Sequence, residues 1–396
     1  MLTQRQLFLS HCAQTSDEPM GIDVVKAKGV FVWDADGKEY IDLISGISVN
    51  NSGHLNAEVV SAIKKQLDDY SYLMVYGEYL HSPQIKLSKW LSDQLPEQLN
   101  SVYLVNSGSE AIEGAIKLAK RYTGRSKIMA FEKSYHGSTY AALSLGGDYE
   151  RKQAFAPFMP GVVNMKYNDP DVINMIDNSF AAVVMEPIQA EAGIIVPEKG
   201  FLQKIKQKCE EHNVLLILDE VQTGIGRTGR FFAFEHFNIE PDVLVLAKGL
   251  GGGMPIGAFI SSNKIMSVFK NNPVLGHITT FGGHPVSCAA AYANINFIKR
   301  EGLVSTVKKK EKLFKKYLTH PAIIEIRSFG LMIAVEFESP KINMSVIKKC
   351  ISMGVLTDWF LYADHCLRIA PPLIITEEQI KQACDKIMNS IESVTQ

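Results

Sequence analysis

Two apolar segments of the chain each end in a residue that can do chemistry on an amine. LILD, at 216–219, ends in Asp219, and VLAKG, at 245–249, contains Lys248. A lysine amine can form a Schiff base with an aldehyde, and a buried carboxylate can keep a pyridine nitrogen protonated. The pair therefore predicts a site for pyridoxal phosphate. Taken separately, Lys248 is more typical of a surface loop, and Asp219 is equally compatible with a helix cap or turn.

The segment SGSEA, at 107–111, is a candidate phosphate site between a predicted strand and a predicted helix. The N–H groups of Gly108 and Ser109 would lie at the helix N-terminus, where unpaired donors and the helix dipole favour an anion. The alternative is an ordinary helix cap, because Ser followed by Glu is also a capping pattern.

A competing signal is GIGRTG at 224–229, which matches the GxGxxG pattern of dinucleotide sites. Its glycines begin only after the polar insertion DEVQT, and FFAFEHF is a poor match to the helix that such a site needs. The glycines after Lys248 do not form a Walker loop, because the lysine precedes them. Both observations disfavour a nucleotide cofactor.

From about residue 100, short apolar strands alternate with amphipathic helices. This order predicts an α/β fold with a mostly parallel sheet that is covered by helices on both faces. Strands are predicted at 101–106, 181–187, 214–220 and 243–249. Ligands of such open sheets bind beyond the carboxyl ends of the strands, so SGSE, EPIQ, DEVQ and AKG should converge on one crevice.

The two ends of the chain follow another pattern. GVFVWDADGKEYIDL, at 29–43, predicts a β-hairpin around an Asp-Ala-Asp-Gly turn. The mixed order of elements near the C-terminus indicates a smaller α+β domain, with helices predicted at 288–300, 345–353 and 376–394. The expected division is an N-terminal segment, 1–55, that joins the small domain, a large cofactor-binding domain, 56–285, and a C-terminal small domain, 286–396.

The composition is that of an ordinary soluble enzyme. The 396 residues are 46% hydrophobic and 21% charged, and 41 Lys and Arg nearly balance 42 Asp and Glu. No overall positive field is available to attract nucleic acid. The basic run KKKEKLFKK, at 308–316, has helical spacing and predicts a solvated helix face with Leu313, Phe314 and Leu318 directed inward.

The six cysteines are scattered and have no metal-ligand spacing. We expect reduced thiols and no metal site. The N-terminal residues lack the basic region of a signal peptide, and no apolar run approaches the length of a membrane span. These features lead us to expect a cytoplasmic protein that binds no membrane.

The motifs, taken in order, resemble those of the class III aminotransferases. These are pyridoxal phosphate enzymes of fold type I and include the acetylornithine, ornithine and 4-aminobutyrate aminotransferases. The resemblance covers about residues 18–390 through NSGSEA, YHGST, EPIQAEAG, LDEVQTGIGRTG, LAKGLGGGMPIGA, TTFGGHP and LRIAPPLIIT. It implies a large, mostly parallel sheet domain of the seven-stranded type and a smaller α+β domain formed by both termini.

The resemblance also implies the residues that contact the cofactor: Gly108, Ser109, Tyr135, His136, Asp219, Val221, Gln222, Lys248 and Thr280. Tyr135 would stack on one face of the ring, opposite Val221, although a core aromatic is the alternative. Gln222 would contact the ring hydroxyl. Thr280 would reach the phosphate from the neighbouring subunit, which implies a homodimer.

For the substrate, the resemblance implies a switch between Glu191 and Arg368. The glutamate neutralises the arginine while an ω-amine is bound. It releases the arginine to grip the α-carboxylate of glutamate or 2-oxoglutarate, a role that suits a planar guanidinium. The alternative is a fixed structural salt bridge.

The chain departs from this family in HGST. The three named enzymes usually have arginine where this chain has Ser138, and a hydroxyl cannot replace the charge that binds a distal carboxylate. Ile47 stands where ornithine enzymes have tyrosine, and Tyr76 completes the predicted substrate set. Arg151 and Arg327 are candidates for a compensating cation.

One further departure is His284, which replaces a more usual asparagine with no consequence that the sequence assigns. Taken together, the motifs predict an aminotransferase that moves an amino group from an ω-amino or amino acid donor to a keto acid, with 2-oxoglutarate as the expected acceptor, by ping-pong kinetics. The alternatives are an aminomutase, racemase or decarboxylase on the same fold, and a non-catalytic protein that binds pyridoxal phosphate. Gln222 fits an aminotransferase better than an aminomutase.

Overall fold

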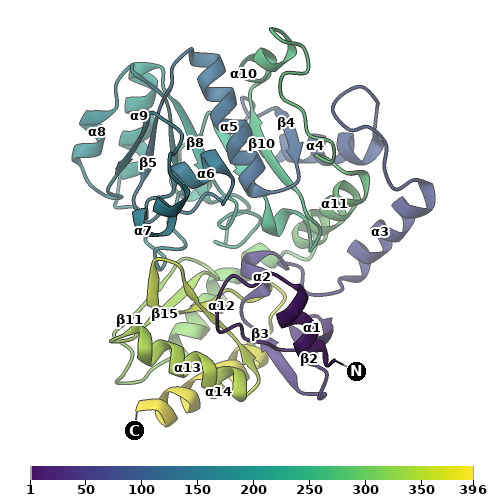
Figure 1. Ribbon diagram of the computed structural model, residues 1–396, viewed down its shortest axis with the longest axis vertical. Helices are drawn as coiled ribbons and strands as arrows, with labels where there is room; N and C mark the ends of the chain where they lie inside the picture. Colours follow the sequence, from purple (N-terminus) through teal and green to yellow (C-terminus); the bar gives the residue numbers. More distant parts are fainter. Residues whose placement is uncertain (1, 396) are drawn as a thin grey trace.

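A seven-stranded sheet forms the centre of the upper half of the molecule in Figure 1, a computed structural model that describes residues 2–395. Its strands run in the order β4 (Ser101–Val105), β10 (Gly257–Ser261), β9 (Val243–Leu246), β8 (Leu215–Asp219), β7 (Phe180–Met185), β5 (Lys127–Phe131) and β6 (Val162–Met165). Only β10 runs antiparallel to its neighbours. The α/β prediction is confirmed.

The central strands are buried throughout, because helices cover both faces of the sheet. Every residue of β7, β8, β9 and β10 is buried. β7 and β8 pair in parallel with Met185 opposite Leu218, and β8 and β9 pair with Asp219 opposite Val245. Their carboxyl ends therefore lie side by side at one edge of the sheet, as the alternation of strands and helices predicts.

Helix α5 (Gly108–Thr123) packs its apolar side on this sheet. The Ser107 hydroxyl caps it by accepting a hydrogen bond from Glu110 N at 3.1 Å, and Gly124 ends it in the left-handed conformation. The other helices of this half are α3 (Ala57–Asp69), α4 (Ser82–Gln94), α6 (Tyr140–Leu145), α7 (Tyr149–Lys152), α8 (Asp171–Met175), α9 (Phe201–His212), α10 (Asn263–Met266) and α11 (Pro285–Arg300). Among them, α11 packs on α3 and α4.

The lower half in Figure 1 contains both termini and two four-stranded sheets. One sheet joins β1 (Val24–Lys28), β2 (Phe31–Asp34) and β3 (Glu39–Asp42) to β13 (Val355–Leu356). The other has the order β11 (Glu325–Ser328), β12 (Ile333–Glu336), β15 (Ala363–Ile369) and β14 (Asp358–Phe360). The helices are α1 (Gln4–His11), α2 (Ser45–Ser48), α12 (Leu303–Tyr317), α13 (Pro340–Ser352) and α14 (Glu377–Thr395).

The predicted hairpin is present, since β2 and β3 are antiparallel. Its strand β3 pairs in parallel with β13, with Val355 opposite Ile41. Strands from both ends of the chain thus share one sheet, as fold type I requires.

Two helices differ from the sequence prediction. α13 begins at Pro340, earlier than predicted, because Ser339 caps it and Pro340 occupies its first turn. In α12, Phe314 and Leu318 are buried as expected, but so are Lys310 and Glu311. Lys310 donates to the carbonyl of Leu373, because its long apolar stem can cross the helix surface and carry the amine to a buried acceptor.

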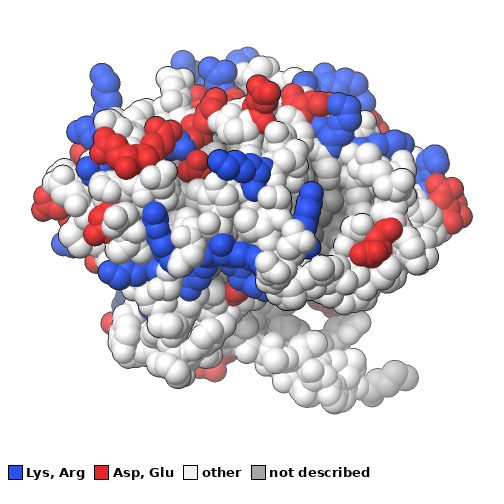
Figure 2. Space-filling view, turned by 90° about the horizontal axis from the view of Figure 1, so that it is seen from above, with Lys and Arg blue, Asp and Glu red and all other residues white. Residues whose placement is uncertain are grey.

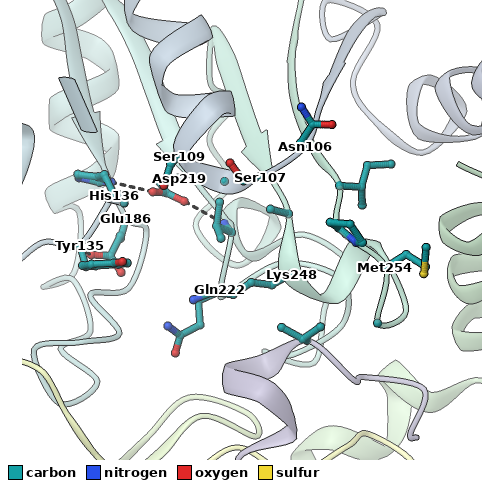
Figure 3. Close-up of a pocket in the computed structure, with 18 residues that line it drawn as sticks. Asn106, Ser107, Ser109, Tyr135, His136, Glu186, Asp219, Gln222, Lys248 and Met254 are labelled. Atoms are coloured by element: carbon teal, nitrogen blue, oxygen red, sulfur yellow. Dashed lines mark hydrogen bonds and ion pairs between the residues drawn. The ribbon is translucent and has the colours of Figure 1, made fainter. Parts of the chain in front are cut away.

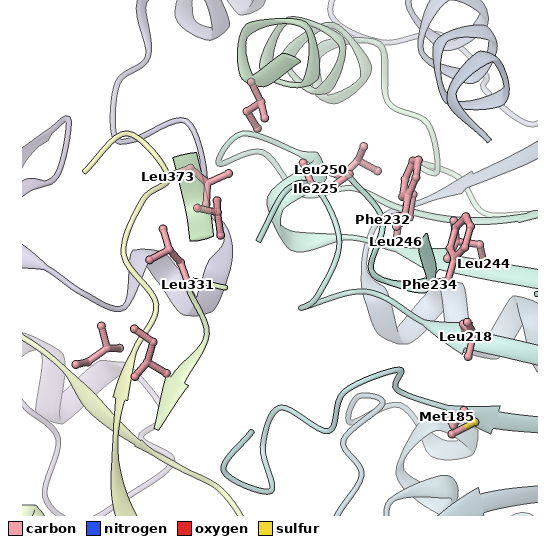
Figure 4. Packing of buried hydrophobic residues seen from close by; sticks show 14 of the residues in the cluster. Met185, Leu218, Ile225, Phe232, Phe234, Leu244, Leu246, Leu250, Leu331 and Leu373 are labelled. Carbon is pink, nitrogen blue, oxygen red and sulfur yellow. The ribbon is translucent and has the colours of Figure 1, made fainter. Parts of the chain in front are cut away.

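The hydrophobic core continues from the large sheet toward the C-terminal half. Figure 4 shows Leu218, Leu244 and Leu246 of the sheet, with Leu331 and Leu373 on the other side of the same cluster. The GIGRTG segment lies at this junction. Its Arg227 is fully buried and donates to Asn51 Oδ1 and the carbonyl of Pro371. No helix of the described residues begins in this segment, so it joins the two halves and does not form a dinucleotide loop.

Basic and acidic side chains share the face shown in Figure 2, which is the top of the molecule in Figure 1. This mixture agrees with the near balance of charges in the sequence. Among residues 2–395, no helix combines the length and the apolarity that crossing a membrane requires.

Candidate active site

A cavity of about 410 Å³ opens beyond the carboxyl ends of the central strands. Its volume is within the range of small-molecule and cofactor sites. Figure 3 shows the side chains that surround it, including Asp219 at the end of β8 and Lys248 after β9. Eight of the nine residues predicted to contact the cofactor line the cavity: Gly108, Ser109, Tyr135, His136, Asp219, Val221, Gln222 and Lys248.

Asp219 is held in place by two hydrogen bonds, drawn as dashed lines in Figure 3. His136 Nδ1 lies 2.7 Å from Oδ2, and the backbone N–H of Val221 donates to Oδ1 at 2.9 Å. Burial opposes protonation of His136, but the hydrogen bond and the charge of Asp219 outweigh it and raise the pKa of the imidazole. The two hydrogen bonds thus fix the position of the carboxylate at the cavity.

Lys248 begins a short 3₁₀ turn (Lys248–Leu250) and has a φ of 43°, a strained conformation for a residue with a side chain. Asn294, from α11, donates to the carbonyls of Gly249 at 2.8 Å and Leu250 at 3.2 Å, which stabilises the turn. Burial lowers the pKa of the Lys248 amine, against the opposing charge of Glu191. A lysine with a lowered pKa is a better nucleophile and base near neutral pH.

The N-terminus of α5 forms the opposite end of the cavity. The first N–H groups of a helix have no partner within it, and Ser107 already satisfies Glu110. A Cβ on Gly108 would lie 3.0 Å from both methyl carbons of Val221 and 3.5 Å from Ala247. Only glycine therefore leaves room at this helix end, where backbone donors and the helix dipole favour a phosphate.

Glu191 and Arg368 form a two-pronged ion pair beside this cavity. Nη1 and Nη2 of Arg368 lie 2.8 Å from Oε1 and Oε2 of Glu191, and both side chains are buried. The amide of Gln222 donates to Glu191 Oε1 at 3.1 Å, so the pair is joined to a residue that lines the cavity. Asp358 lies 3.0 Å from Nε of Arg368, which adds a second carboxylate to the guanidinium.

None of the five predicted substrate residues lines this cavity; Glu191 and Arg368 lie beside it, and the other three are placed elsewhere. Ser138 is exposed, and its hydroxyl is 3.2 Å from the hydroxyl of Tyr135. Ile47 belongs to α2, which packs beside the Lys248 turn, and it is 36% exposed. Tyr76 lines a separate cavity of about 240 Å³ with Tyr103 and Thr279.

The remaining predicted cofactor contact, Thr280, is exposed and does not line the cavity of its own chain. Its carbonyl accepts a hydrogen bond from the hydroxyl of Tyr72 at 2.6 Å. The ring of Tyr72 stacks on His284 with their centroids 5.6 Å apart, and His284 Nδ1 caps α11 by accepting from Val286 N. His284 therefore supports the Thr280 loop and starts the helix that follows it.

The sequence interpretation missed Glu186 and Asn106, both of which line the cavity. Glu186 directly follows β7, and its carboxylate accepts from the backbone N–H groups of Tyr135 at 3.2 Å and Ala190 at 3.0 Å. Burial raises the pKa of Glu186 to about 7. The signal was available, because Glu186 also ends an apolar strand.

A group of three potential metal ligands lies in the C-terminal half, at Glu336, His365 and Cys366. Arg327 occupies the space between two of them. Its guanidinium donates to Glu336 and lies 3.2 Å from Cys366 Sγ, and its Nε donates to the carbonyl of Gly193 at 2.8 Å. The group is therefore an ion-pair cluster around an arginine.

Comparison with known proteins gives one consistent result. The family model for class III aminotransferases matches residues 12–391. The acetylornithine aminotransferase of Methanopyrus kandleri is 38% identical over 375 residues, which are 94% of this chain and 95% of that protein. The acetylornithine aminotransferase of Bacillus subtilis is 37% identical over 376 residues, 93% of this chain and 95% of that protein.

Solved structures give the same result. The ornithine aminotransferase of Toxoplasma gondii superposes with a TM-score of 0.91 at 30% identity, over 99% of this chain and 95% of that one. A transaminase from the marine bacterium Virgibacillus gives a TM-score of 0.92 at 27% identity, over 98% of each chain.

The cavity suits the cofactor of this family. The glycine at the start of α5 leaves room for a phosphate, Asp219 is a fixed carboxylate for a ring nitrogen, and Lys248 is an amine with a lowered pKa for an aldehyde. With the family match over nearly the whole chain, these features give its identity. The chain belongs to the class III aminotransferases and is a pyridoxal phosphate-dependent transaminase that moves an amino group to a keto acid.

Proposed function

We propose that this transaminase takes the amino group of an ω-amino donor and passes it to 2-oxoglutarate. The observation that carries the proposal is the buried pair of Glu191 and Arg368, joined to the cavity through Gln222. While the pair is intact, the guanidinium is neutralised and an uncharged part of a donor can lie against it. When Glu191 moves aside, Arg368 offers two parallel N–H groups to the α-carboxylate of 2-oxoglutarate or glutamate.

The two central residues have complementary roles in this proposal. Pyridoxal phosphate supplies a carbonyl carbon that condenses with amines and a ring that withdraws electrons. Lys248 would hold the cofactor through Nζ, and its amine, with a lowered pKa, would serve as the general base that moves a proton from the substrate carbon. Asp219 keeps a proton on the ring nitrogen, and the hydrogen bond from His136 holds that carboxylate in position.

The other cavity residues position the cofactor. Gly108 and Ser109 bind the phosphate through the N-terminus of α5. Tyr135, Val221 and Gln222 also line the cavity, so Tyr135 and Val221 would hold the ring and Gln222 would contact its hydroxyl while its amide stays bonded to Glu191. Rigid support of this kind lowers the cost of bringing the reacting atoms together.

The donor has a far end that need not be anionic. Among the residues that line the cavity, Lys248 is the only lysine and no arginine is present. Ser138 supplies a hydroxyl at the position where an arginine would bind a distal carboxylate. A carboxylate placed there without a cation would lose solvation without compensation. Diamines and ω-amino compounds with neutral ends fit this environment.

The test is a panel of single amino donors, with 2-oxoglutarate as acceptor and glutamate as the product measured. The panel compares diamines with N-acetylornithine and 4-aminobutyrate, because the relatives include enzymes named for acetylornithine. We expect kcat/KM for the best diamine or neutral-ended donor to exceed that for 4-aminobutyrate. A clear preference for 4-aminobutyrate would contradict the proposed donor class.

We also propose that the active enzyme is a homodimer in which Thr280 of one subunit completes the phosphate site of the other. Exposed apolar side chains support this proposal. Phe281, next to Thr280 in the chain, is 53% exposed, and Leu80 and Val274 are 94% and 70% exposed. Large exposed apolar side chains are candidates for burial in a protein interface. The six cysteines are free, which supports a reducing compartment and hence the cytoplasm.

A further inference from the structure

If 2-oxoglutarate is the acceptor, its second carboxylate needs a cation. Arg368 would bind the α-carboxylate, and Ser138 cannot pair with the other one. An ionised carboxylate that leaves water without a partner is strongly disfavoured. The partner must therefore come from a basic side chain near Glu191 and Arg368 that has a hydrogen-bond donor available.

The basic side chains around the site differ in how fully they are used. Arg327 contacts Glu325, Glu336 and the carbonyl of Gly193. Lys152 is buried and donates to the carbonyls of Ser144 and Gly146, both within its own segment. Both cations are therefore already engaged by acceptors of the protein itself.

Arg151 differs from both. It lies in α7, which Figure 1 places at the boundary between the two halves, next to the turn between β14 and β15. Its side chain is 49% exposed, and its only carboxylate neighbour among the described residues is Asp148, one helical turn away at 3.4 Å. Nη2 donates to the carbonyl of Leu361 at 2.7 Å, while Nη1 has no hydrogen-bond partner in residues 2–395.

The same turn holds Glu191. The N–H of Leu361 donates to Glu191 Oε2 at 3.1 Å, and the N–H of Tyr362 donates to the Glu191 carbonyl at 3.0 Å. A single residue, Leu361, therefore contacts the Glu191 carboxylate through its N–H and the Arg151 guanidinium through its carbonyl. The guanidinium also lies 5.8 Å from the centre of the Tyr362 ring.

The charges that act on Tyr362 also indicate that Arg151 and Glu191 both lie near its ring. Burial raises the pKa of its hydroxyl, and the charges of Glu186, Asp148 and Glu191 add to the effect, whereas Arg151 opposes it. Arg151 and Glu191 therefore act on the same phenol from positions on either side of one turn. The carboxylate that a substrate would displace from Arg368 and the Arg151 guanidinium are thus both bonded to Leu361.

We propose that Arg151 binds the second carboxylate of the dicarboxylic keto acid, in place of the cation that is absent at Ser138. This inference rests on the proposed acceptor. It assigns Arg368 to the α-carboxylate and Arg151 to the carboxylate at the other end. Nη2 of Arg151 can keep its bond to the Leu361 carbonyl while Nη1 and Nε bind the substrate carboxylate. The only interaction lost is the weak ion pair between Nε and Asp148 within α7.

The test compares 2-oxoglutarate with 2-oxopentanoate, which has the same chain length and ends in a methyl group. The holoenzyme is first converted to its amine form, and the rate of its reaction with each keto acid is followed by absorbance. In Arg151→Gln, we expect the apparent KM for 2-oxoglutarate to rise about 10- to 100-fold, the range for loss of a charged hydrogen bond. The apparent KM for 2-oxopentanoate should change less than about 2-fold.

Two further variants complete the test. Arg151→Lys keeps the charge but loses the planar fork, so it should recover part of the 2-oxoglutarate affinity. Arg300→Gln is the matched control, because it removes the same charge from an exposed arginine that pairs with Glu58 on another surface. It should leave both KM values unchanged.

The outcomes distinguish an error in the role of Arg151 from an error in the proposed acceptor. If the wild-type enzyme uses 2-oxoglutarate but Arg151→Gln has an unchanged KM for it, or an equal rise for both keto acids, the assignment of Arg151 is wrong and the acceptor stands. If the wild-type amine form reacts with 2-oxopentanoate but not with 2-oxoglutarate, the proposed acceptor is wrong and the role of Arg151 falls with it.

Discussion

Asp219 and Glu186 stand at the ends of neighbouring strands but have different hydrogen-bond partners. Asp219 pairs with His136, which stabilises the charged carboxylate. Glu186 accepts only backbone N–H groups, and burial raises its pKa to about 7. In the sequence both are simply acids that end an apolar strand. A pKa depends on the partner in space, which the spacing along the chain does not contain.

The raised pKa of Glu186 has a measurable consequence for stability. The folded protein holds this proton more tightly than the unfolded chain, so the associated stability is present below the usual glutamate pKa of about 4.3 and is lost as pH rises through about 7. Glu186→Gln cannot ionise. We expect the free energy of unfolding of the wild type, relative to this variant, to fall by up to about 3 kcal/mol between pH 4 and pH 8.

The measurement is urea unfolding of the holoenzyme at several pH values, with wild type and Glu186→Gln in parallel. The charge of Glu186 is one of the causes that raise the pKa of the nearby His136, so the difference between the two proteins reports the coupled pair. A constant difference in stability across this pH range would show that Glu186 titrates as an ordinary exposed glutamate.

The Glu191 and Arg368 pair makes a second prediction at this scale. Glu191→Gln leaves the arginine with a neutral partner, so its guanidinium is freer for an α-carboxylate. We expect the ratio of kcat/KM for glutamate to kcat/KM for the preferred ω-amine to rise at least about 10-fold, since a charged contact is changed for one class of substrate only.

The control is Asp358→Asn, which changes the other carboxylate near Arg368 but leaves the two bonds to Glu191 in place. It should shift the ratio much less. An unchanged ratio in Glu191→Gln would identify the pair as a fixed structural salt bridge, the alternative that the sequence left open.

At the scale of the element, the N-terminus of α5 makes the most specific prediction. A Cβ at position 108 would lie 3.0 Å from both methyl carbons of Val221. Gly108→Ala should therefore weaken binding of pyridoxal phosphate about 10-fold or more, because overpacking at a rigid contact costs about 1–3 kcal/mol. The double variant Gly108→Ala with Val221→Ala should recover much of the affinity.

Titration of the apoenzyme with pyridoxal phosphate, followed by fluorescence, gives the dissociation constants. Gly124→Ala provides the control at the other end of α5, where φ is 72° and no atom lies within 4 Å of an added Cβ. This change should lower the melting temperature and leave cofactor affinity unchanged. If Gly108→Ala binds pyridoxal phosphate as tightly as the wild type does, the N-terminus of α5 is not part of the phosphate site.

The helices and strands that could be predicted are those whose sequence signals lie within or next to the element. The β2–β3 hairpin, the strands β7 to β9 and the helix α5 follow from alternation, apolar runs and a capping serine. The start of α13 was predicted too late, although Ser339 and Pro340 are a readable start signal. The burial of Lys310 was not predictable, because its acceptor, the Leu373 carbonyl, is distant in sequence.

The site shows the same limit. Apolar strands ending in Asp219 and Lys248 predicted the cofactor chemistry, and the cavity brings both together. The position of Arg151 beside Glu191 could not be predicted, since it depends on a turn between β14 and β15 that contacts both residues. Long-range contacts of this kind are set by tertiary packing.

At the scale of the whole molecule, the exposed apolar side chains Leu80, Val274 and Phe281 predict association. Leu80→Glu places a charge at a side chain that is 94% exposed in the single chain. If this surface is buried in a homodimer, the variant should sediment as a monomer at low micromolar concentration and lose activity in proportion, because a buried unpaired charge is costly.

The matched control is Ile324→Glu, which adds the same charge at a side chain that is 62% exposed in the other half of the molecule. It should remain associated and active. A Leu80→Glu protein that is fully active as a monomer would contradict the contribution of Thr280 from a second subunit.

The most direct test of the central account follows the half-reaction. The yellow holoenzyme is mixed with one amino donor and no acceptor, and loss of the visible absorbance of the cofactor is measured. We predict conversion of one cofactor per subunit to its amine form, with one equivalent of carbonyl product, and a rate at least about 10³-fold lower in cofactor-loaded Lys248→Ala. Release of carbon dioxide, or racemisation of the donor, without that stoichiometric conversion would contradict amino transfer by this site.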